Sequence, residues 1–444
     1  DAGVAQLVYP TGGVIANSNF DVKAKIKNYG LDTLTSANVE WQLDGTSQAT
    51  YNFSGLIEPD TISGELNLGT LNVSQGAHAL KLWTTNPNGT FDDNTGNDTL
   101  EMSFYGCANL LSGTYTIGGT SADYQDFSEA LLGLTQCGIN GPVTFNVNSG
   151  TYNEQLNIPV ISGASATNTI TFQSATGDST AVILKHNAAY PGENYLVKLD
   201  GVSNIAFKGM TFETEDSTLA RAVVLKNNPE NISFQNNRFL TIDLADESDD
   251  RALVYTEDTV GNTIEFLNNR FENGANALTL LGSGMQNVTV NHNVFENQYA
   301  SAALITGAET AEVKNNLVNT ASLYDSFNGI ALNQASGSFE ISYNELYASS
   351  TQIGYGIIVN GSQGDSLNHA SVYNNAVLIN ANAGGTTLSA GIINLESRFV
   401  DYYFNTVKMT GNDQNSTAVA VYDNTPGETR GIIVKNNIFS NFAD

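Results

Sequence analysis

The amino-acid sequence predicts an all-β protein in which an antiparallel β-sandwich is followed by a short capping helix and a right-handed parallel β-helix. Three observations predict this fold class. Apolar and polar residues alternate through the first hundred positions, a motif of paired asparagines recurs in the second half, and one amphipathic helical segment separates the two patterns. The predicted boundaries are 1–106 for the sandwich, 107–140 for a linker with the helix, and 141–444 for the β-helix.

The composition limits the classes of partner. The chain has 444 residues and a formal net charge of −28, with 17 Lys and Arg against 45 Asp and Glu. This balance disfavours nucleic acid and anionic membranes, because both are negatively charged. No apolar run has transmembrane length, so we expect no membrane insertion. The chain begins at Asp1 without a Met or a signal core and stops in mid-coil at IFSNFAD, so we expect an exported piece of a larger protein.

Residues 1–106 consist of short segments of period two, interrupted about every 8–12 residues by Gly, Pro, Asn or Asp, which is typical of an antiparallel sandwich. Asp44-Gly45 predicts a two-residue hairpin turn. IKNYG at 26–30 and the acidic loop NPNGTFDDNTGND at 86–98 resemble the immunoglobulin-like adhesion modules of bacterial surface proteins. The loop contains three candidate calcium ligands, for which a solvated acidic turn is the alternative interpretation: Asp92, Asp93 and Asp98.

The chain contains only two cysteines, Cys107 and Cys137. In an exported protein their best interpretation is one disulfide, which would stabilise the fold by roughly 3–4 kcal/mol through loop entropy. Two buried free thiols are the alternative.

One segment has helical periodicity. Phe127, Ala130, Leu131 and Leu134 recur at i, i+3, i+4 and i+7 in residues 124–134, with Asp123 as the expected N-cap. Because a solenoid needs its first apolar layer covered, we expect this helix to be a cap.

The second half repeats one motif, seen in ISFQNNRF (232–239), IEFLNNRF (264–271) and IIVKNNIF (432–439). A second apolar segment follows each copy, as in AVVL (222–225) and GIIV (356–359), which is typical of parallel strands covered on both faces. The second asparagine of the motif recurs at intervals of 23–32 residues. Each interval has the length of one coil, and we expect about ten coils in all. These asparagines are Asn237, Asn269, Asn293, Asn316, Asn344, Asn375, Asn405 and Asn437.

A structural role for these asparagines follows from their chemistry. Asn tolerates the left-handed backbone that a sharp corner requires, and stacked amides can hydrogen-bond in a ladder. A row of asparagines that binds sugar is the functional alternative.

Residues 112–444 resemble a known family through GTYTIGGTSADYQDFSEALLGL, GPVTFNVNSGTYNEQLNIP and ISGASATNTITFQSATGDSTAVIL. They look like the pectate-lyase-like β-helix of large secreted Bacteroidetes proteins. The resemblance implies type IX export and an extracellular or cell-surface location.

Seven Asp-Ser/Thr triplets resemble the O-glycosylation signal of these bacteria. Asx and Ser/Thr turns are the alternative interpretation of each triplet. The hydroxyl residues are Thr33, Thr61, Thr99, Ser179, Ser217, Thr259 and Ser366.

Signals for catalysis are weak in this sequence. A glycosidase needs two carboxylates a few ångströms apart, but the expected outward positions of the second segments, such as Val224 and Val254, are apolar. The cluster ADESDDR (245–251) has the pattern of a solvated loop. Glu396 and Asp423, near Arg398, are the only cross-coil catalytic candidates.

The sequence therefore predicts a non-catalytic extracellular surface protein of adhesin type, with a rigid β-helix stalk that contacts glycans or other surface proteins. Two alternatives stay open at this stage: a polysaccharide lyase or glycoside hydrolase, and a filament or sheath subunit that associates end to end through its final coil. No cofactor is expected apart from calcium.

Overall fold

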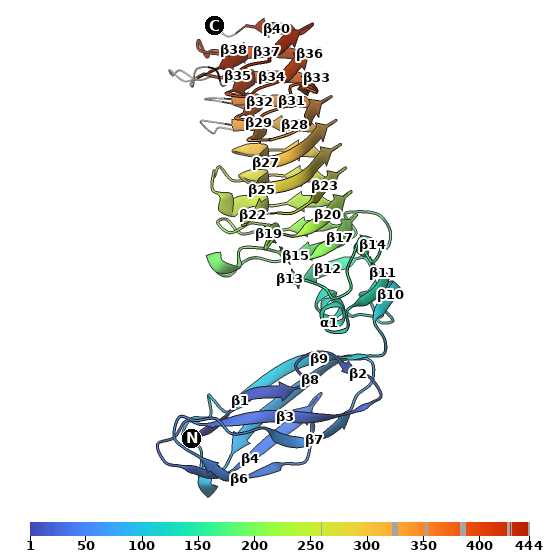
Figure 1. The fold of residues 1–444 in the computed structure, drawn as a ribbon, viewed down its shortest axis with the longest axis vertical. Coiled ribbons are helices and arrows are strands. Elements are labelled where there is room, and N and C mark those ends of the chain that lie inside the picture. The colour runs from blue at the N-terminus through green and yellow to red at the C-terminus, as the bar shows by residue number, and fades with distance from the viewer. Residues whose placement is uncertain are drawn as a thin grey trace. The chain divides into compact units, whose positions relative to one another are not determined.

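A computed structural model describes residues 1–258, 260–321, 327–350, 354–381, 388–423, 427 and 429–442. The chain divides into two compact units (Figure 1). We call residues 1–113, 128–141 and 161–163 the sandwich unit, and residues 114–127, 142–160 and 164–444 the solenoid unit. None of the helices in the described parts of the chain has the length and hydropathy that a membrane crossing requires.

The sandwich unit contains two sheets, and nearly all of their strand pairs are antiparallel, as predicted. Asp44 and Gly45 have positive φ and connect β4 to β5, which confirms the predicted hairpin turn. The first sheet has the order β1 (Ala2–Tyr9), β3 (Asn19–Asn28), β7 (Leu66–Asn72). The second has the order β2 (Val14–Ile15), β9 (Thr99–Cys107), β8 (Gly76–Thr85), β4 (Leu34–Leu43), β5 (Thr46–Ser47), with β6 (Tyr51–Ile57) on β4.

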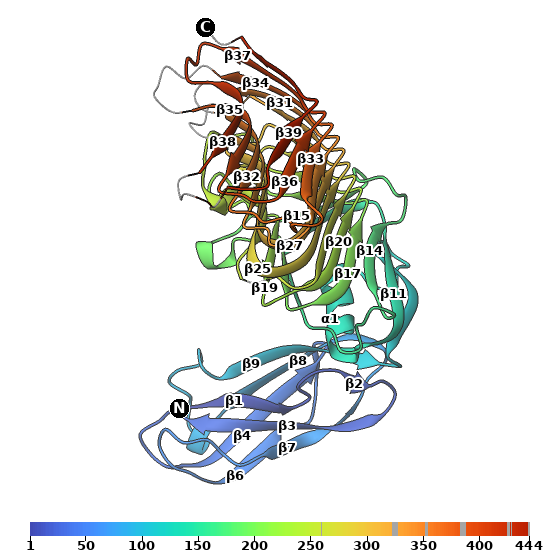
Figure 2. The same cartoon turned by 45° about the horizontal axis from the view of Figure 1, so that its top comes forward.

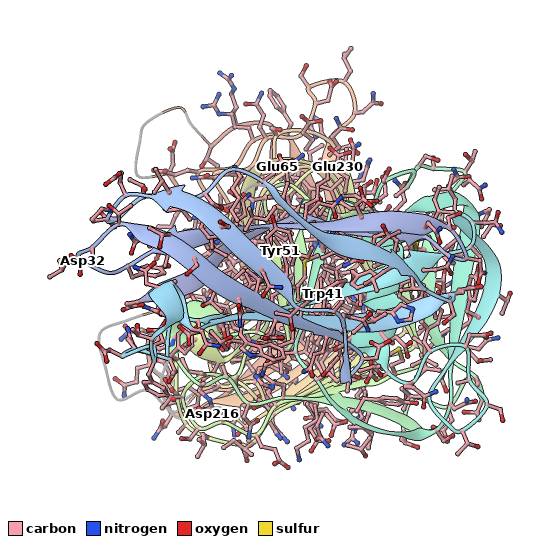
Figure 3. The ribbon with its side chains drawn as sticks, turned by 90° about the horizontal axis from the view of Figure 1, so that it is seen from below. Asp32, Trp41, Tyr51, Glu65, Asp216 and Glu230 are labelled. Atoms are coloured by element: carbon pink, nitrogen blue, oxygen red, sulfur yellow. A yellow bond between two sulfur atoms is a disulfide. The ribbon has the colours of Figure 1, made fainter. Side chains whose placement is uncertain are left out.

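Alternation along the strands builds the sandwich core. Val22, Ala24 and Ile26 of β3 are fully buried, and the residues between them are partly exposed. Trp41 of β4, labelled in Figure 3, packs in the same core, and its indole N–H donates to the carbonyl of Ala49 at 2.8 Å. The buried indole therefore keeps a hydrogen-bond partner, as a buried Trp requires.

Cys107 and Cys137 form a disulfide with a Cα–Cα distance of 5.7 Å, which confirms the predicted bond. Cys137 is the last residue of helix α1 (Phe127–Cys137). The helix begins three residues after the predicted start, and the expected N-cap was wrong, because Asp123 instead accepts hydrogen bonds from Thr116. Phe127 and Tyr152 both belong to the solenoid unit, and their rings pack edge to face with centroids 5.1 Å apart.

The solenoid unit is a parallel β-helix, as predicted. Its strands form three rows in which each strand pairs in parallel with its counterpart one coil later (Figures 1 and 2). In chain order, a coil contributes a strand to the first row, turns a corner into the second row, and continues through a loop into the third row. β25 (Asn276–Asn291) and β27 (Ser301–Lys314) run without a break from the third row of one coil into the first row of the next.

The strands of the rows have these bounds. The first row contains β11 (Ile139–Val147), β14 (Ile170–Ser174), β17 (Ser203–Lys208), β20 (Glu230–Gln235), β23 (Thr263–Leu267), β30 (Phe339–Ser342), β33 (Ala370–Tyr373), β36 (Val400–Tyr403) and β39 (Ile433–Lys435). The second row contains β12 (Gly150–Asn153), β15 (Val182–Lys185), β18 (Thr211–Glu213), β21 (Arg238–Leu240), β24 (Arg270–Glu272), β26 (Val294–Glu296), β28 (Leu317–Thr320), β31 (Glu345–Ser350), β34 (Ala376–Ala381), β37 (Thr406–Gly411) and β40 (Ile438–Asn441). The third row contains β13 (Leu156–Pro159), β16 (Val197–Asp200), β19 (Val223–Lys226), β22 (Ala252–Thr256), β29 (Phe327–Asn333), β32 (Gly354–Asn360), β35 (Ala390–Leu395) and β38 (Thr417–Tyr422). β10 (Leu111–Ile117) precedes β11, and three short 3₁₀ helices lie in loops: η1 (Pro87–Gly89), η2 (Pro191–Glu193) and η3 (Asp249–Arg251).

Stacked aromatic rings fill part of the solenoid core. Because successive coils pair in register, Phe207, Phe234 and Phe266 lie directly above one another, with ring centroids 5.5 and 5.4 Å apart. A second stack follows the corner, where Phe239 and Phe271 have centroids 4.7 Å apart. Each aromatic pair stabilises the fold by about 0.5–1.5 kcal/mol beyond the contribution of the apolar area that its rings bury.

A ladder of asparagine side chains follows the corner between the first and second rows. Asn316 is typical: its backbone N–H and its side-chain amide both donate to Oδ1 of Asn344, at 3.0 and 2.9 Å, and the same amide donates to the carbonyl of Val290. The same bonds join Asn237, Asn269, Asn293, Asn316, Asn344, Asn375, Asn405 and Asn437 in sequence.

The backbone of this corner differs from the expectation in one respect. The left-handed residue is the one before the ladder asparagine, for example Asn236, with φ of 57°, and Asn268, with φ of 55°. Tyr343 and Phe404 adopt this conformation in their coils, although bulky residues rarely do. The ladder asparagine therefore contributes the hydrogen bonds of its side-chain amide, and the residue before it makes the turn.

Candidate functional site

The catalytic candidates lie in turns that follow the third row. Glu396 follows β35, has a left-handed φ of 50°, and donates its backbone N–H to the carbonyl of Tyr422 one coil later. Asp423 follows β38, and its Oδ2 accepts the backbone N–H of Gly427 at 3.1 Å. Arg398 donates its backbone N–H to Ser362. These contacts give Glu396 and Asp423 places in stacked turns.

The register corrects the expected outward positions of the third row. Tyr255 pairs with Val224, so Val254 aligns instead with the inward residue Val223. Val224 and Val254 are both buried. The outward residues of β16, β19 and β22 are thus Lys198, Val224 and Tyr255, and none of these three is a carboxylate.

A groove opens beside the turn that contains Arg398. It has a volume of ≈ 460 Å³ and is lined by Ser336, Gly337, Ser338, Gln363, Gly364, Asp365, Ser366, Asn368 and Phe399. The centroid of the Phe399 ring is 5.6 Å from that of the His369 ring and 5.7 Å from the Arg430 guanidinium carbon. The His369 ring is in turn held by Asp401, at 2.8 Å from Nδ1 to Oδ1.

The chemistry of this groove suits binding better than acid–base catalysis. Amides and hydroxyls surround one aromatic ring, and Asp365 is the only carboxylate in the described lining. Its Oδ1 accepts the backbone N–H of Leu367 at 2.7 Å in an Asx turn. A second carboxylate, which a glycosidase would need, is missing from the described lining.

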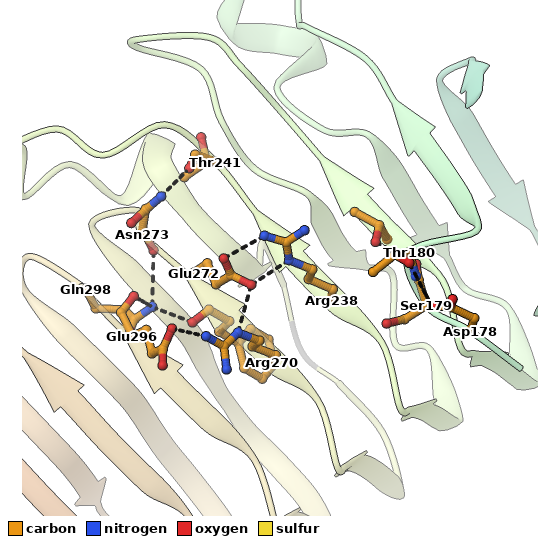
Figure 4. A network of polar contacts seen from close by, with 12 residues as sticks. Asp178, Ser179, Thr180, Arg238, Thr241, Arg270, Glu272, Asn273, Glu296 and Gln298 are labelled. Atoms are coloured by element: carbon orange, nitrogen blue, oxygen red, sulfur yellow. Dashed lines mark hydrogen bonds and ion pairs between the residues drawn. The ribbon is translucent and has the colours of Figure 1, made fainter. Parts of the chain in front are cut away.

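An ion-pair ladder lies on the outward face of the second row (Figure 4). Arg238 of β21 binds Glu272 of β24 through two bonds of 2.5 and 2.7 Å. Arg270 also binds Glu272, at 2.9 Å, and reaches Glu296 of β26. The hydrogen bonds from Arg238 lower the pKa of Glu272. Burial opposes this effect, but the charges of Arg238 and Arg270 add to it, so the pKa of Glu272 lies below its ordinary value.

Glu272 and Glu296 are register partners on adjacent coils, so this ladder contains a carboxylate pair. A glycosidase pair requires one carboxyl that stays protonated. Arg238 and Arg270 favour the ionised form of Glu272, so the pair is suited to structure. This carboxylate pair was not predicted, although FLNNRFE places Arg and Glu at alternate positions of the strand that follows the corner.

The acidic run 245–251 contains an unexpected buried cation. Its acidic residues are exposed or partly exposed, but Arg251 is fully buried. The Arg251 guanidinium donates to the carbonyls of Ile242, at 2.8 Å, and Leu244, at 3.3 Å. Arg251 thus fastens its own loop, and the expectation of a fully solvated loop was wrong for this residue.

Two of the three calcium candidates come together in the sandwich unit. Carboxylate oxygens of Asp92, Asp98 and Asp1 all lie within 4.8 Å of one another. Asp92 and Asp98 are each 5% exposed, whereas Asp93 is exposed and stands outside the cluster. Burial and, after it, the Asp92 carboxylate raise the pKa of Asp98 to about 6.

The glycosylation candidates that the structure describes have exposed or partly exposed side chains; Thr259 lies outside the described residues. In three triplets the aspartate Oδ1 accepts the N–H two residues later, which is the Asx-turn geometry of the alternative interpretation. These aspartates are Asp178, Asp216 and Asp365.

No family model and no curated protein matches the chain. Several solved structures do. The CARDB domain of a Pyrococcus furiosus protein in complex with di-metal ions is 17% identical, over 24% of this chain and 91% of that one, with a TM-score of 0.21. A pectin methylesterase from Aspergillus niger is 14% identical, over 73% and 90%, with a TM-score of 0.33. A GH136 lacto-N-biosidase from Eubacterium ramulus is 8% identical, over 74% and 68%, with a TM-score of 0.41. The solved structures that are similar to this sandwich and parallel β-helix include carbohydrate-active enzymes.

Proposed function

We propose that this chain is a non-catalytic structural protein of the extracellular surface, in which the solenoid unit is a rigid stalk and the sandwich unit an adhesion module. The observation that carries the proposal is the unbroken asparagine ladder from Asn237 to Asn437. Its bonds lie between coils, so bending a coil away from its neighbour would break buried hydrogen bonds as well as strand pairs. Buried polar groups left without partners are costly, which makes the solenoid stiff.

The proposed extracellular location is supported by the Cys107–Cys137 disulfide, because such bonds persist in oxidising compartments. The net charge of −28 keeps such a protein apart from other acidic surfaces and favours uncharged or weakly charged ligands.

We place glycan contact at the groove beside Phe399. An aromatic ring offers an apolar platform to the face of a sugar, and the surrounding amides and hydroxyls match sugar hydroxyls in hydrogen bonding. Gln363 and Asn368 are exposed at this groove and available to a ligand.

The test combines a binding assay with an activity assay on the full chain. We expect binding to a subset of a glycan array, with no release of reducing or unsaturated ends from neutral or acidic polysaccharides. The double variant Gln363→Ala/Asn368→Ala should weaken array binding by at least about tenfold, since two hydrogen-bonding side chains are lost. Leu367→Ala, which changes an exposed neighbour outside the lining, is the matched control.

Release of sugar ends would overturn the non-catalytic part of the proposal. Array binding that the double variant leaves unchanged would overturn the groove as the site of contact.

A further inference from the structure

A cluster of carboxylates lies in the sandwich unit where the start of β1 meets the loop before β9. Asp1 precedes β1, Asp92 lies within the loop, and Asp98 immediately precedes β9. β1 belongs to the first sheet and β9 to the second. An ion held by these three residues would therefore connect the two sheets at one end of the sandwich.

An unpartnered oxygen marks the cluster as a ligand site. Asp98 is only 5% exposed, and its Oδ1 is buried without a hydrogen-bond partner. The side-chain oxygen of the adjacent Asn97 is also buried and unpartnered, while its amide donates to Asp1 at 3.1 Å. Buried polar atoms without partners are rare in folded proteins and call for a bound group to satisfy them.

The charge of the cluster is poorly compensated. No described Lys, Arg or His forms an ion pair with Asp92 or Asp98. The α-amino group of Asp1 offsets part of the negative charge at Asp98. Two buried carboxylates at this separation repel each other, so the arrangement favours a bound cation.

The protein backbone holds the ligands in place. Asp92 accepts the N–H groups of Ala2, at 3.0 Å, and Asn94, at 3.2 Å. Val4 donates its N–H to the carbonyl of Asp98 at 3.2 Å. The Asn97 carbonyl approaches Gly3 so closely that a Cβ there would clash, which explains glycine at this position. The loop and the start of β1 are therefore already joined around the cluster.

The donor set selects calcium among common cations. All available donors are carboxylate or amide oxygens, whereas zinc sites usually include nitrogen or sulfur. The carboxylate oxygens of the cluster all lie within 4.8 Å of one another, and one Ca²⁺ ion with oxygens at about 2.3–2.6 Å can contact all of them. Mg²⁺ demands near-ideal octahedral geometry and gives up its waters reluctantly, so buried carboxylates that the backbone already holds suit it less well than Ca²⁺.

We infer that the sandwich unit binds one Ca²⁺ ion between Asp1, Asp92 and Asp98, with the Asn97 side-chain oxygen as a further ligand. The ion neutralises the buried carboxylates and fastens the first strand to the loop 86–98. This site is independent of the glycan groove proposed above, which lies in the solenoid unit.

Calcium titration of the full chain, after removal of metal with a chelator, tests the inference. We expect one more Ca²⁺ ion bound to the wild type than to Asp98→Asn, with a Kd of about 0.1–1 mM, the range of extracellular calcium modules. Ca²⁺ should raise the Tm of the wild type, and Mg²⁺ at the same concentration should raise it less. Asp98→Asn should weaken calcium binding at least about tenfold, because a charged ligand is lost.

Asp93→Asn is the matched control, since it removes one negative charge from the same loop outside the cluster. Its calcium Kd should stay within about twofold of the wild-type value, as expected for an exposed charge. Should Asp98→Asn fail to fold, Asn97→Ala removes a ligand without removing charge and should weaken binding in the same titration. Equal calcium binding by wild type and the site variants, or no bound Ca²⁺ at 10-fold above the expected range, would overturn the inference.

Discussion

The side-chain oxygen of Asn293 accepts two hydrogen bonds from Asn269 one coil earlier, from its backbone N–H at 2.9 Å and from its side-chain amide at 3.1 Å. Asn293 in turn donates to the carbonyl of Phe266 and to Asn316. One buried amide therefore satisfies backbone groups of two coils and joins three members of the ladder.

Replacing Asn293 by Ala should destabilise the solenoid unit. The substitution leaves the N–H of Asn269 and the carbonyl of Phe266 buried without their partners, at about 1–3 kcal/mol for each group. We expect a total loss of about 2–5 kcal/mol in the free energy of unfolding, measured by denaturant titration. Asn157→Ala, an exposed asparagine of β13, is the control and should change stability by less than about 0.5 kcal/mol. A loss at Asn293 no larger than the control would contradict the role of the ladder.

Truncating the phenylalanine stack should show a graded effect. Phe234 is fully buried between Phe207 and Phe266, so Phe234→Ala should cost about 3–5 kcal/mol through lost burial and a cavity. Phe234→Leu fills more of the space and should cost less. Calorimetric unfolding of both variants, beside Leu367→Ala at a residue that is 89% exposed, would measure the series. Equal losses for Leu and Ala would argue against tight stacking.

Removing the disulfide should lower the free energy of unfolding, because the unfolded chain gains conformational freedom. The bond joins residues 30 apart, and loop entropy predicts a contribution of about 3–4 kcal/mol. We expect the double variant Cys107→Ser/Cys137→Ser to unfold at lower denaturant concentration than the oxidised wild type. Wild type treated with a reductant should behave like the double variant, and the reductant should leave the variant itself unchanged.

Glu272 should make stability depend on pH in the acid range. Its pKa is lowered in the folded state, chiefly by the hydrogen bonds from Arg238, so its contribution is complete above the unfolded pKa near 4.3. The contribution is lost as the pH falls through the folded pKa. We expect Glu272→Gln to be less stable than wild type by about 1–2 kcal/mol at pH 7, with a difference that shrinks between pH 5 and pH 3.

The control for this titration is Glu309→Gln, which changes an exposed carboxylate of β27. Its difference from wild type should be small at every pH. A Glu272→Gln difference that stays constant down to pH 3 would mean that the ion pair contributes nothing to folding.

The fold class was predictable because it depends on the local periodicity of the sequence. Alternation predicted the sandwich, and the recurrence of Asn237 and its counterparts predicted coils, since each corner needs the same chemistry. The strand that follows the corner was harder to interpret. FLNNRFE predicts a corner, and Arg270 and Glu272 pair within it. Their other partners, Arg238 and Glu296, lie one coil away, where local sequence gives no register.

The candidate site residues were less predictable because they depend on closure in three dimensions. Asp92 and Asp98 share a loop, but Asp1 joins them from more than 90 positions away, and Asp93 turns out to face solvent. Arg251 was interpreted as one charge of a solvated loop, but its side chain is buried and donates to backbone carbonyls of the same loop. The groove at Phe399 is assembled from three successive coils, so no single segment of sequence contains it.

The spacing of the ladder asparagines has a consequence for how this protein can change. Neighbouring members are between 23 and 32 residues apart, but every pair makes the same hydrogen bonds. Extra residues in a coil therefore enter its loops and leave the register of every other coil untouched. Each coil can gain, lose or exchange its surface segment independently, which makes the solenoid a frame whose exterior is open to variation while its interior is fixed.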